Sequence, residues 1–287
     1  MKALGDLHAG VLDGSPEWCK GDAAREFVLA GSGGFSMVRG AMLSDPSVLA
    51  LALLAALCIG LAKAGFSGIS LISVVLFADI YGPRASVGLT LPLLIAADLL
   101  VYPAFRKYGS WRPVWRLLGP ALLGLGVGWW LLGTVSDETA RRVIGGCVFL
   151  MVLLQVFRQW RPVVFGRLAE SRGFGMGAGV LGGFATMMAN AAGPVIQLYL
   201  LARQVPKMEL IGIAARFFLL INILKVPLNA NLALITPASL MDNLKLLPAV
   251  GVGILGGKWL LRHVPQRAFE WMIVGFSLLA ALRMLFT

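Results

Sequence analysis

The stretch CIGLAKAGFSGIS, residues 58–70, interrupts a long apolar segment in the first third of the chain. Apolar residues dominate before it, over 48–61, and after it, over 69–78. Lys63 stands inside the stretch, with two glycines close behind it. Glycine disfavours a continuous helix by up to ~1 kcal/mol, and a charged side chain within a membrane costs at least ~2.5–3.5 kcal/mol. The stretch therefore predicts a helix that breaks within a membrane, beside a cation.

The whole chain has the composition of a membrane protein. Of its 287 residues, 58% are hydrophobic and 14% are charged, and the mean hydropathy is +0.82. Soluble domains are typically about a quarter charged, and a spanning helix needs roughly 20 mostly apolar residues. The chain holds many such runs. Because lipid leaves backbone groups no other partner within one segment, we predict an all-α polytopic membrane protein.

The basic residues are also distributed as in a membrane protein. The chain carries 25 Lys and Arg against 14 Asp and Glu, and they cluster between apolar runs, over 106–116 and 158–172. This is the pattern of cytoplasmic loops, so it requires no nucleic-acid partner. The three cysteines are far apart and match no metal-site spacing. We therefore expect no metal, no cofactor and no enzymatic activity.

Eight apolar segments can be read along the chain. The first and the fifth are interrupted, near Lys63 and at the sequence MANAAGP. The segments are 48–78, 86–104, 114–133, 140–157, 174–202, 208–228, 239–261 and 268–286.

These segments form two halves that repeat. A shift of 124 residues pairs Asp98 with Asn222, and further pairs at shifts of 124, 128 and 129 keep the same order: Gly88 with Gly212, Pro103 with Pro227, Pro120 with Pro248, Gly128 with Gly256, and Gly146 with Gly275. Two halves that each open with a broken apolar segment are typical of transporters, whose sites lie at broken helices near the membrane midplane.

We divide the chain accordingly into four parts: an N-terminal extension (1–47), a first membrane half (48–158), a basic linker (159–173) and a second membrane half (174–287). The extension lacks an apolar span and a signal-peptide pattern. It is either a disordered tail or the result of an upstream start codon, with the true start at Met37 or Met42. Deleting residues 1–40 should leave membrane insertion and transport intact.

The two interrupted segments leave two topologies open. Each is about 30 residues long, or ~45 Å as a helix, which is long for one span and short for two. Each could cross once, which gives eight spans. Alternatively, each could be a re-entrant or half-length pair, and the two halves would then be inverted repeats. We favour the second arrangement.

Three motifs carry a resemblance to a known family. The sequences GLAKAGFSG (60–68), GGFATMMANAAGPVIQLYLLARQVPK (182–207) and NILKVPLN (222–229) resemble the sulfite exporter TauE/SafE family, and the likeness covers roughly residues 48–285. The resemblance implies a multi-pass transporter of small anions, typically sulfite or organosulfonates, in the cell membrane. Two departures leave the exact anion open: the first break lacks a run of three glycines, and Asn190 stands where related sequences often have histidine.

Two other classes of function remain as alternatives. One is an intramembrane enzyme that acts on a lipid-linked substrate, which would need an acid-base or nucleophile set. The other is an assembly or anchoring protein, which would not need polar residues at both breaks. A homo-oligomer is compatible with all three classes.

The first break is a candidate anion site. The N-terminus of its second half-helix, which we place near Phe66, would present free N–H groups and a positive dipole end to an anion. Lys63 would add a full charge, and Gly65 would let the backbone approach. The alternative is that Lys63 snorkels to an interface.

The second half offers a matching set of polar residues in apolar runs. Asn190, Gly193 and Gln197 belong to the second break, whereas Asn222 and Lys225 share one face of the sixth segment. We predict that they line the substrate site. Alternatively, the amides hydrogen-bond between helices, and Lys225 anchors its helix at an interface.

Asp98 is an acid well inside an apolar run. A carboxylate in that position is either a proton carrier that couples transport or a fixed counter-ion for a lysine.

Overall fold

The structure is a computed structural model that describes residues 45–161, 163–164, 171–203 and 205–263. All regular secondary structure in this part of the chain is helical. Most of the predicted extension, the centre of the basic linker and the predicted segment 268–286 lie outside the described residues. The helical unit beginning at Pro46 is therefore described by itself.

The described helices follow the predicted apolar segments closely, with both interrupted segments split in two. In chain order they are α4 (Pro46–Lys63), the short 3₁₀ helix η3 (Ser67–Ile69), α5 (Ser70–Tyr81), α6 (Pro83–Phe105), α7 (Trp111–Thr134), α8 (Asp137–Trp160), α10 (Arg172–Ala189), α11 (Gly193–Ala202), α12 (Lys207–Asn231) and α13 (Pro237–His263).

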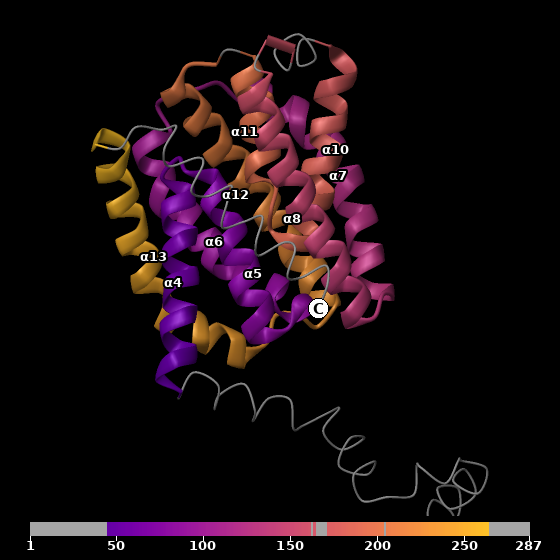
Figure 1. The fold of residues 1–287 in the computed structure, drawn as a ribbon, viewed down its shortest axis with the longest axis vertical. Coiled ribbons are helices and arrows are strands. Elements are labelled where there is room, and N and C mark those ends of the chain that lie inside the picture. Colours follow the sequence, from indigo (N-terminus) through magenta and orange to yellow (C-terminus); the bar gives the residue numbers. More distant parts are fainter. Residues whose placement is uncertain (1–44, 162, 165–170, 204, 264–287) are drawn as a thin grey trace, which may run out of the picture. The chain divides into compact units, whose positions relative to one another are not determined.

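The first break, residues 64–66, separates α4 from η3 and α5. Gly65 has a φ of 127°, a conformation that side-chain-bearing residues rarely adopt, so glycine is required there. The second half-helix begins at Ser67 as η3 and continues from Ser70, one residue later than the predicted start near Phe66. The chain then runs back beside α4, and the two helices form a hairpin (Figure 1).

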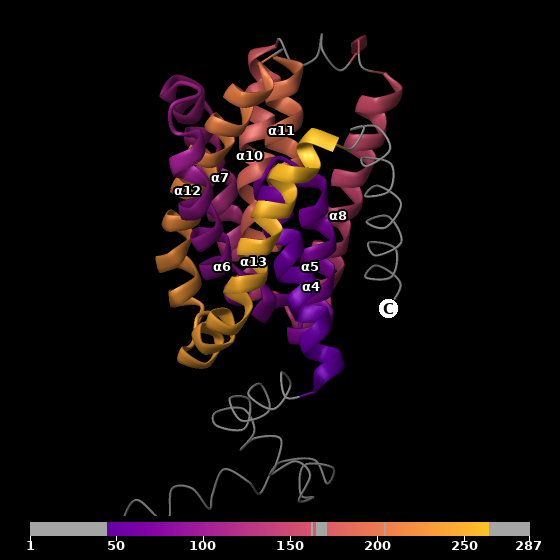
Figure 2. The same cartoon turned by 90° about the vertical axis from the view of Figure 1, so that its left-hand side faces the viewer.

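The second break, residues 190–192, separates α10 from α11. Asn190 ends α10 in the left-handed conformation, with a φ of 53°, and its backbone N–H bonds back to the last turn of the helix. Pro194 then occupies the first turn of α11, where its missing N–H is not needed. The hairpins lie toward different ends of the unit: α4 and α5 toward the lower end, α10 and α11 toward the upper end (Figures 1 and 2).

Helices α6 and α12 cross the middle of the unit side by side in opposite directions. Three contacts along the pair show that the helices are antiparallel: Gly88 lies against Leu234, Asp98 bonds to Asn222, and Gly212 lies against Tyr108. Arg216 of α12 secures the same pairing at one end. Its guanidinium donates hydrogen bonds to the carbonyl oxygens of Tyr108, at 2.6 Å, and of Arg106 in the loop after α6, so its role is structural.

Two further helix pairs pack through glycines. A Cβ on Gly253 of α13 would collide with the backbone of Leu57 in α4, and a Cβ on Gly124 of α7 would collide with the backbone of Val180 in α10. Each contact helix carries a second glycine four residues on, at Gly257 or at Gly128. Small residues at this spacing let membrane helices approach closely.

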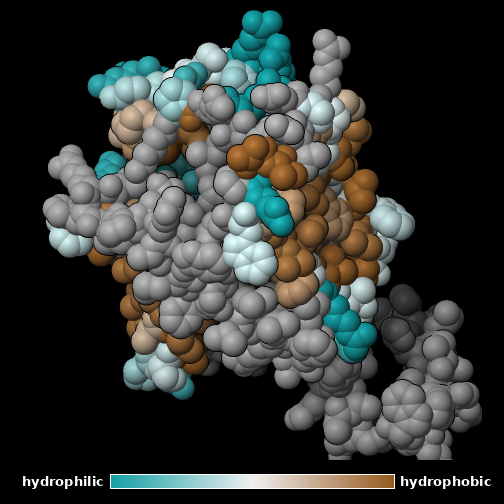
Figure 3. Space-filling model, turned by 45° about the horizontal axis from the view of Figure 1, so that its top comes forward, coloured by the Kyte–Doolittle hydropathy of each residue, from teal (hydrophilic) through white to brown (hydrophobic). Residues whose placement is uncertain are grey.

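Five helices of the described chain are long and apolar enough to span a membrane: α4, α6, α7, and the stretches Met208–Asn231 and Pro237–Leu260. Large apolar side chains such as Leu123, Trp130 and Leu255 are well exposed on the outside. In Figure 3 hydrophobic side chains gather on the right-hand flank and hydrophilic ones at the upper end. The protein is a multi-pass membrane protein.

Candidate functional site

The two helix breaks meet in the interior of the unit. Ser67, just after the first break, donates a hydrogen bond from its hydroxyl to Oε1 of Gln197 in α11. The Nε2 of Gln197 lies 3.4 Å from the carbonyl oxygen of Gly65. Gly193, which begins α11, also lies against Ser67. Residues more than 120 positions apart in the sequence thus form one polar cluster.

Lys63 stands beside this cluster and is paired. Its Nζ lies 2.6 Å from Oδ1 of Asp98, and the second carboxylate oxygen, Oδ2, accepts a hydrogen bond of 2.8 Å from Nδ2 of Asn222. The Lys63 ammonium also lies 4.6 Å from the centre of the Phe218 ring, within the range of a cation–π interaction. The side chain of Lys63 is 12% exposed and that of Asp98 only 1%, so this ion pair is almost fully enclosed.

Lys225 stands behind the second break. Its side chain is fully buried, and its Nζ donates to the carbonyl oxygen of Thr186 at 2.6 Å, to the Thr186 hydroxyl and to Oδ1 of Asn190. The Thr186 carbonyl belongs to the last turn of α10, which is the negative end of that helix dipole. Lys225 therefore neutralises and holds the end of α10 at the break.

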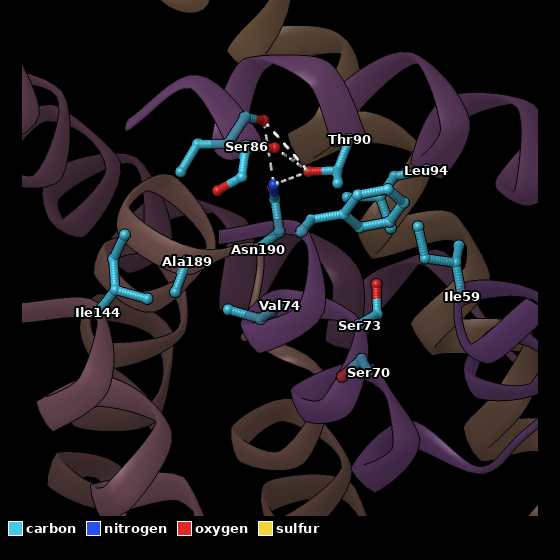
Figure 4. A pocket seen from close by; sticks show the side chains of 12 residues that line it. Ile59, Ser70, Ser73, Val74, Ser86, Thr90, Leu94, Ile144, Ala189 and Asn190 are labelled. Atoms are coloured by element: carbon cyan, nitrogen blue, oxygen red, sulfur yellow. Dashed lines mark hydrogen bonds between the residues drawn. The ribbon is translucent and has the colours of Figure 1, made fainter. Parts of the chain in front are cut away.

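Asn190 links the second break to the other half of the chain. Its Nδ2 donates to the carbonyl oxygen of Val87, at 3.1 Å, and to the hydroxyl of Thr90, at 2.5 Å, both on α6 (Figure 4). The Thr90 hydroxyl in turn donates to the carbonyl oxygen of Ser86 at 2.7 Å. The Asn190 side chain thus bridges Lys225 on one side and α6 on the other.

Three neighbouring cavities surround these residues. The central cavity encloses about 430 Å³ of space between atoms, part of which is open to solvent. Lys63, Ser67, Thr186, Asn190, Gly193, Phe218 and Asn222 are among the residues that line it. The Gln197 cavity shares Lys63 and Phe218 with it and is also lined by Gly65, Asp98, Gln197 and Leu210. The Ser73 cavity shares Asn190 with it and is also lined by Ser73, Ser86 and Thr90 (Figure 4).

A family model described as sulfite exporter TauE/SafE matches residues 49–284, most of the chain. The chain belongs to this family. Neither the search of curated proteins nor the search of solved structures found a match. TauE/SafE is a family of membrane transporters, so membership implies a membrane exporter of sulfite or a related anion.

The predicted site residues fall into two groups in this TauE/SafE chain. The structure brings most of them to the central or Gln197 cavities: Lys63, Gly65, Asp98, Asn190, Gly193, Gln197 and Asn222. Two lie apart from the cavity walls. Phe66 packs in an apolar cluster with Cys58 and Ile69, and Lys225 reaches the central cavity only through Thr186 and Asn190.

Other residues that line these cavities were not predicted from the sequence. Ser67 could have been found, because it is a polar residue within the quoted first break. Phe218 lies one helical turn before Asn222, so helical spacing would have placed it on the same face. Thr186 and Thr90 carry no such signal, since a threonine in an apolar helix commonly bonds its own backbone.

Among the described residues, no group of His, Cys, Asp or Glu side chains is placed to hold a metal ion. The polar groups of the site are instead an ion pair, amides and hydroxyls.

Proposed function

We propose that this TauE/SafE protein carries sulfite or a small organosulfonate across the cell membrane by alternating access, with the anion bound in the central cavity. The observation that carries the proposal is the position of Lys63. Its ammonium lines the central cavity at the point where the helix breaks of the two halves meet. In transporters the N-termini of broken half-helices commonly point at anionic substrate groups near the membrane midplane, and Lys63 would add a full positive charge there.

Two positively polarised groups would bind the anion. One is the Lys63 ammonium, which can leave Asp98 for the substrate. The other is the N-terminus of α11 at Gly193, where the positive end of the helix dipole favours a negative ligand. Gly193 lines the central cavity together with Ser67 and Asn190, which add side-chain hydrogen-bonding groups.

We further propose that the two halves are inverted repeats. The repeat pairs Asp98 with Asn222, and these two side chains contact each other between the antiparallel helices α6 and α12. The repeat also pairs Gly88 with Gly212, and each packs on the loop that follows the other half's long helix. The packing of α4 on α13 and of α10 on α7 is likewise reciprocal. These contacts support a two-fold axis that passes near Asp98.

The cavities provide independent support for inversion. Positions 124 residues apart line the Ser73 cavity in one half and the Gln197 cavity in the other: Ser73 with Gln197, Ser86 with Leu210, Val87 with Ile211, Thr90 with Ala214, Leu94 with Phe218. A two-fold axis in the membrane plane would direct such cavities toward opposite sides. They would then serve as the two access routes to the central cavity.

Counterflow in proteoliposomes tests the function. Purified protein is reconstituted, loaded in turn with sulfite, a small sulfonate or sulfate, and exposed to a trace of the same labelled anion outside. We expect transient accumulation of label for sulfite or a sulfonate, and none in protein-free liposomes. Absence of counterflow for every anion, with correctly folded protein, would contradict the proposal.

A further inference from the structure

The charges around the central cavity can be counted. Among the described residues, Lys63, Asp98 and Lys225 are the charged side chains that line this cavity or hydrogen-bond to a residue lining it. Lys63 and Asp98 cancel each other as an ion pair. Three acceptor atoms surround the Nζ of Lys225, which therefore uses all three hydrogens of an ammonium. With Lys225 as an ammonium, the charges around the empty cavity sum to one positive unit.

A residue that lines the cavity also has an acceptor without a donor. A carboxylate only accepts hydrogen bonds, so Asn222 must turn its Nδ2 toward Asp98 and its Oδ1 away from it. This Oδ1 is buried and has no hydrogen-bond partner among the described residues. Asn222 lines the central cavity. An unpaired buried amide oxygen is costly, and a ligand that brings a hydrogen to it removes that cost.

We infer that the site selects a singly charged sulfur oxyanion that carries one O–H or N–H donor, and that Asp98 sets the charge limit. This inference rests on the proposed function of the same cavity. A monoanion brings the local charge to zero, whereas a dianion leaves one negative charge unbalanced in an enclosed site. The donor hydrogen meets Oδ1 of Asn222. Hydrogensulfite and hydroxyl-bearing sulfonates meet both conditions, and sulfate meets neither.

Binding to the purified full-length protein tests the charge rule, with methanesulfonate as the monoanion and sulfate as the dianion. By calorimetry, the unmodified protein should bind methanesulfonate at least ~10-fold more tightly than sulfate, because one uncompensated charge is repelled in a site of low dielectric. Asp98→Asn raises the net charge to two positive units, so it should abolish or reverse this preference. Glu138→Gln removes an exposed carboxylate on α8 and should leave the ratio unchanged.

Binding of hydroxyethanesulfonate tests the role of Oδ1 of Asn222 as an acceptor. This anion carries a hydroxyl group that methanesulfonate lacks, so it should bind more tightly than methanesulfonate to the unmodified protein. Asn222→Leu should remove that advantage while methanesulfonate still binds.

Three outcomes would overturn the inference: sulfate binding as tightly as methanesulfonate to the unmodified protein, a ratio unchanged in folded Asp98→Asn, or no benefit from the hydroxyl group. The first and third outcomes are measured on the unmodified protein, so they test the inference even if Asp98→Asn does not fold. Failure of the proposed function is distinguishable, because then no anion would bind or be transported at all.

Discussion

At the scale of single residues, Lys63 combines two roles that a substitution can separate. It neutralises the buried Asp98, and in the proposed function it also contacts the anion. From the sequence alone, removing a costly membrane charge would be expected to preserve or improve folding. The ion pair changes that expectation, because loss of one partner leaves the other charge buried and uncompensated.

Lys63→Gln should therefore lower stability, by about 3–5 kcal/mol, as is typical for a broken buried ion pair. At matched folding it should also weaken anion binding by roughly 10- to 150-fold, since a charge-assisted contact is typically worth ~1.5–3 kcal/mol. Thermal unfolding in detergent and calorimetry measure the two effects.

The double variant Lys63→Gln, Asp98→Asn separates the two roles. It removes both charges, so it should recover much of the lost stability but not the affinity. Recovery of affinity in the double variant would show that Lys63 does not contact the anion.

Lys225 should behave differently, because it holds the end of α10 and does not line a cavity. Lys225→Met removes the lysine donor from Oδ1 of Asn190, a loss of about 1–3 kcal/mol, and leaves the Thr186 carbonyl, among the described residues, with only the backbone N–H of Asn190. We expect a clear loss of thermal stability and, at matched folding, a smaller loss of affinity than in Lys63→Gln. Lys107→Gln, at an exposed position, is the control. Equal affinity losses for Lys63→Gln and Lys225→Met would mean that both lysines touch the anion.

At the scale of helices, glycine packing makes a prediction with a matched control on the same helix. Gly253 of α13 lies against the backbone of α4, whereas a Cβ on Gly251 would meet nothing within 4 Å. Alanine favours a helix over glycine by up to ~1 kcal/mol at either site. Gly251→Ala should be neutral or stabilising, and Gly253→Ala should be destabilising, as measured by thermal unfolding.

The equivalent pair on α7 extends the test. A Cβ on Gly124 would collide with α10, and one on Gly126 would meet nothing within 4 Å. The same contrast is expected there. If all four alanine variants had similar stability, close packing at these glycines would not be limiting.

The sequence predicted both helix breaks to within a residue or two, because glycine, proline and a charge within an apolar run are strong local signals. It also predicted the all-helical class. It could not distinguish a side chain that lines a cavity from one that stands behind the wall. Asn222 and Lys225 share a helix face by spacing, yet Asn222 lines the central cavity and Lys225 lies behind Thr186 and Asn190. That difference depends on the neighbouring helix, which spacing along one helix does not report.

Phe66 is a similar case. The sequence predicts it at the start of the second half-helix, but the break leaves its ring against Cys58 and Ile69. The turn at Gly65 decides the direction of the side chain, and a φ of 127° is not predictable from neighbouring residue types.

At the scale of the whole molecule, inverted halves predict opposite access at equivalent positions. Ser86 and Leu210 are related by the repeat shift and line the two outer cavities. In a background with Cys19, Cys58 and Cys147 changed to alanine, Ser86→Cys and Leu210→Cys should react with a membrane-impermeant maleimide from opposite sides. Saturating anion should change the two rates in opposite directions, because one route closes as the other opens.

The labelling is read in vesicles of known orientation. Reaction of both cysteines from the same side would contradict inverted halves. Rates that rise or fall together on adding anion would contradict alternating access.

The contact between Asp98 and Asn222 has an evolutionary consequence. If the two halves descend from one duplicated gene, an ancestor assembled from two identical copies brought this position against its own copy. Two asparagines can exchange amide hydrogen bonds there, whereas two aspartates repel. Lys63 shows the same divergence, because the equivalent position in the second half, 124 residues on, is the uncharged Met187. A symmetric dimer could hold two such ion pairs or none, so a single ion pair became possible only once duplication let the two copies differ.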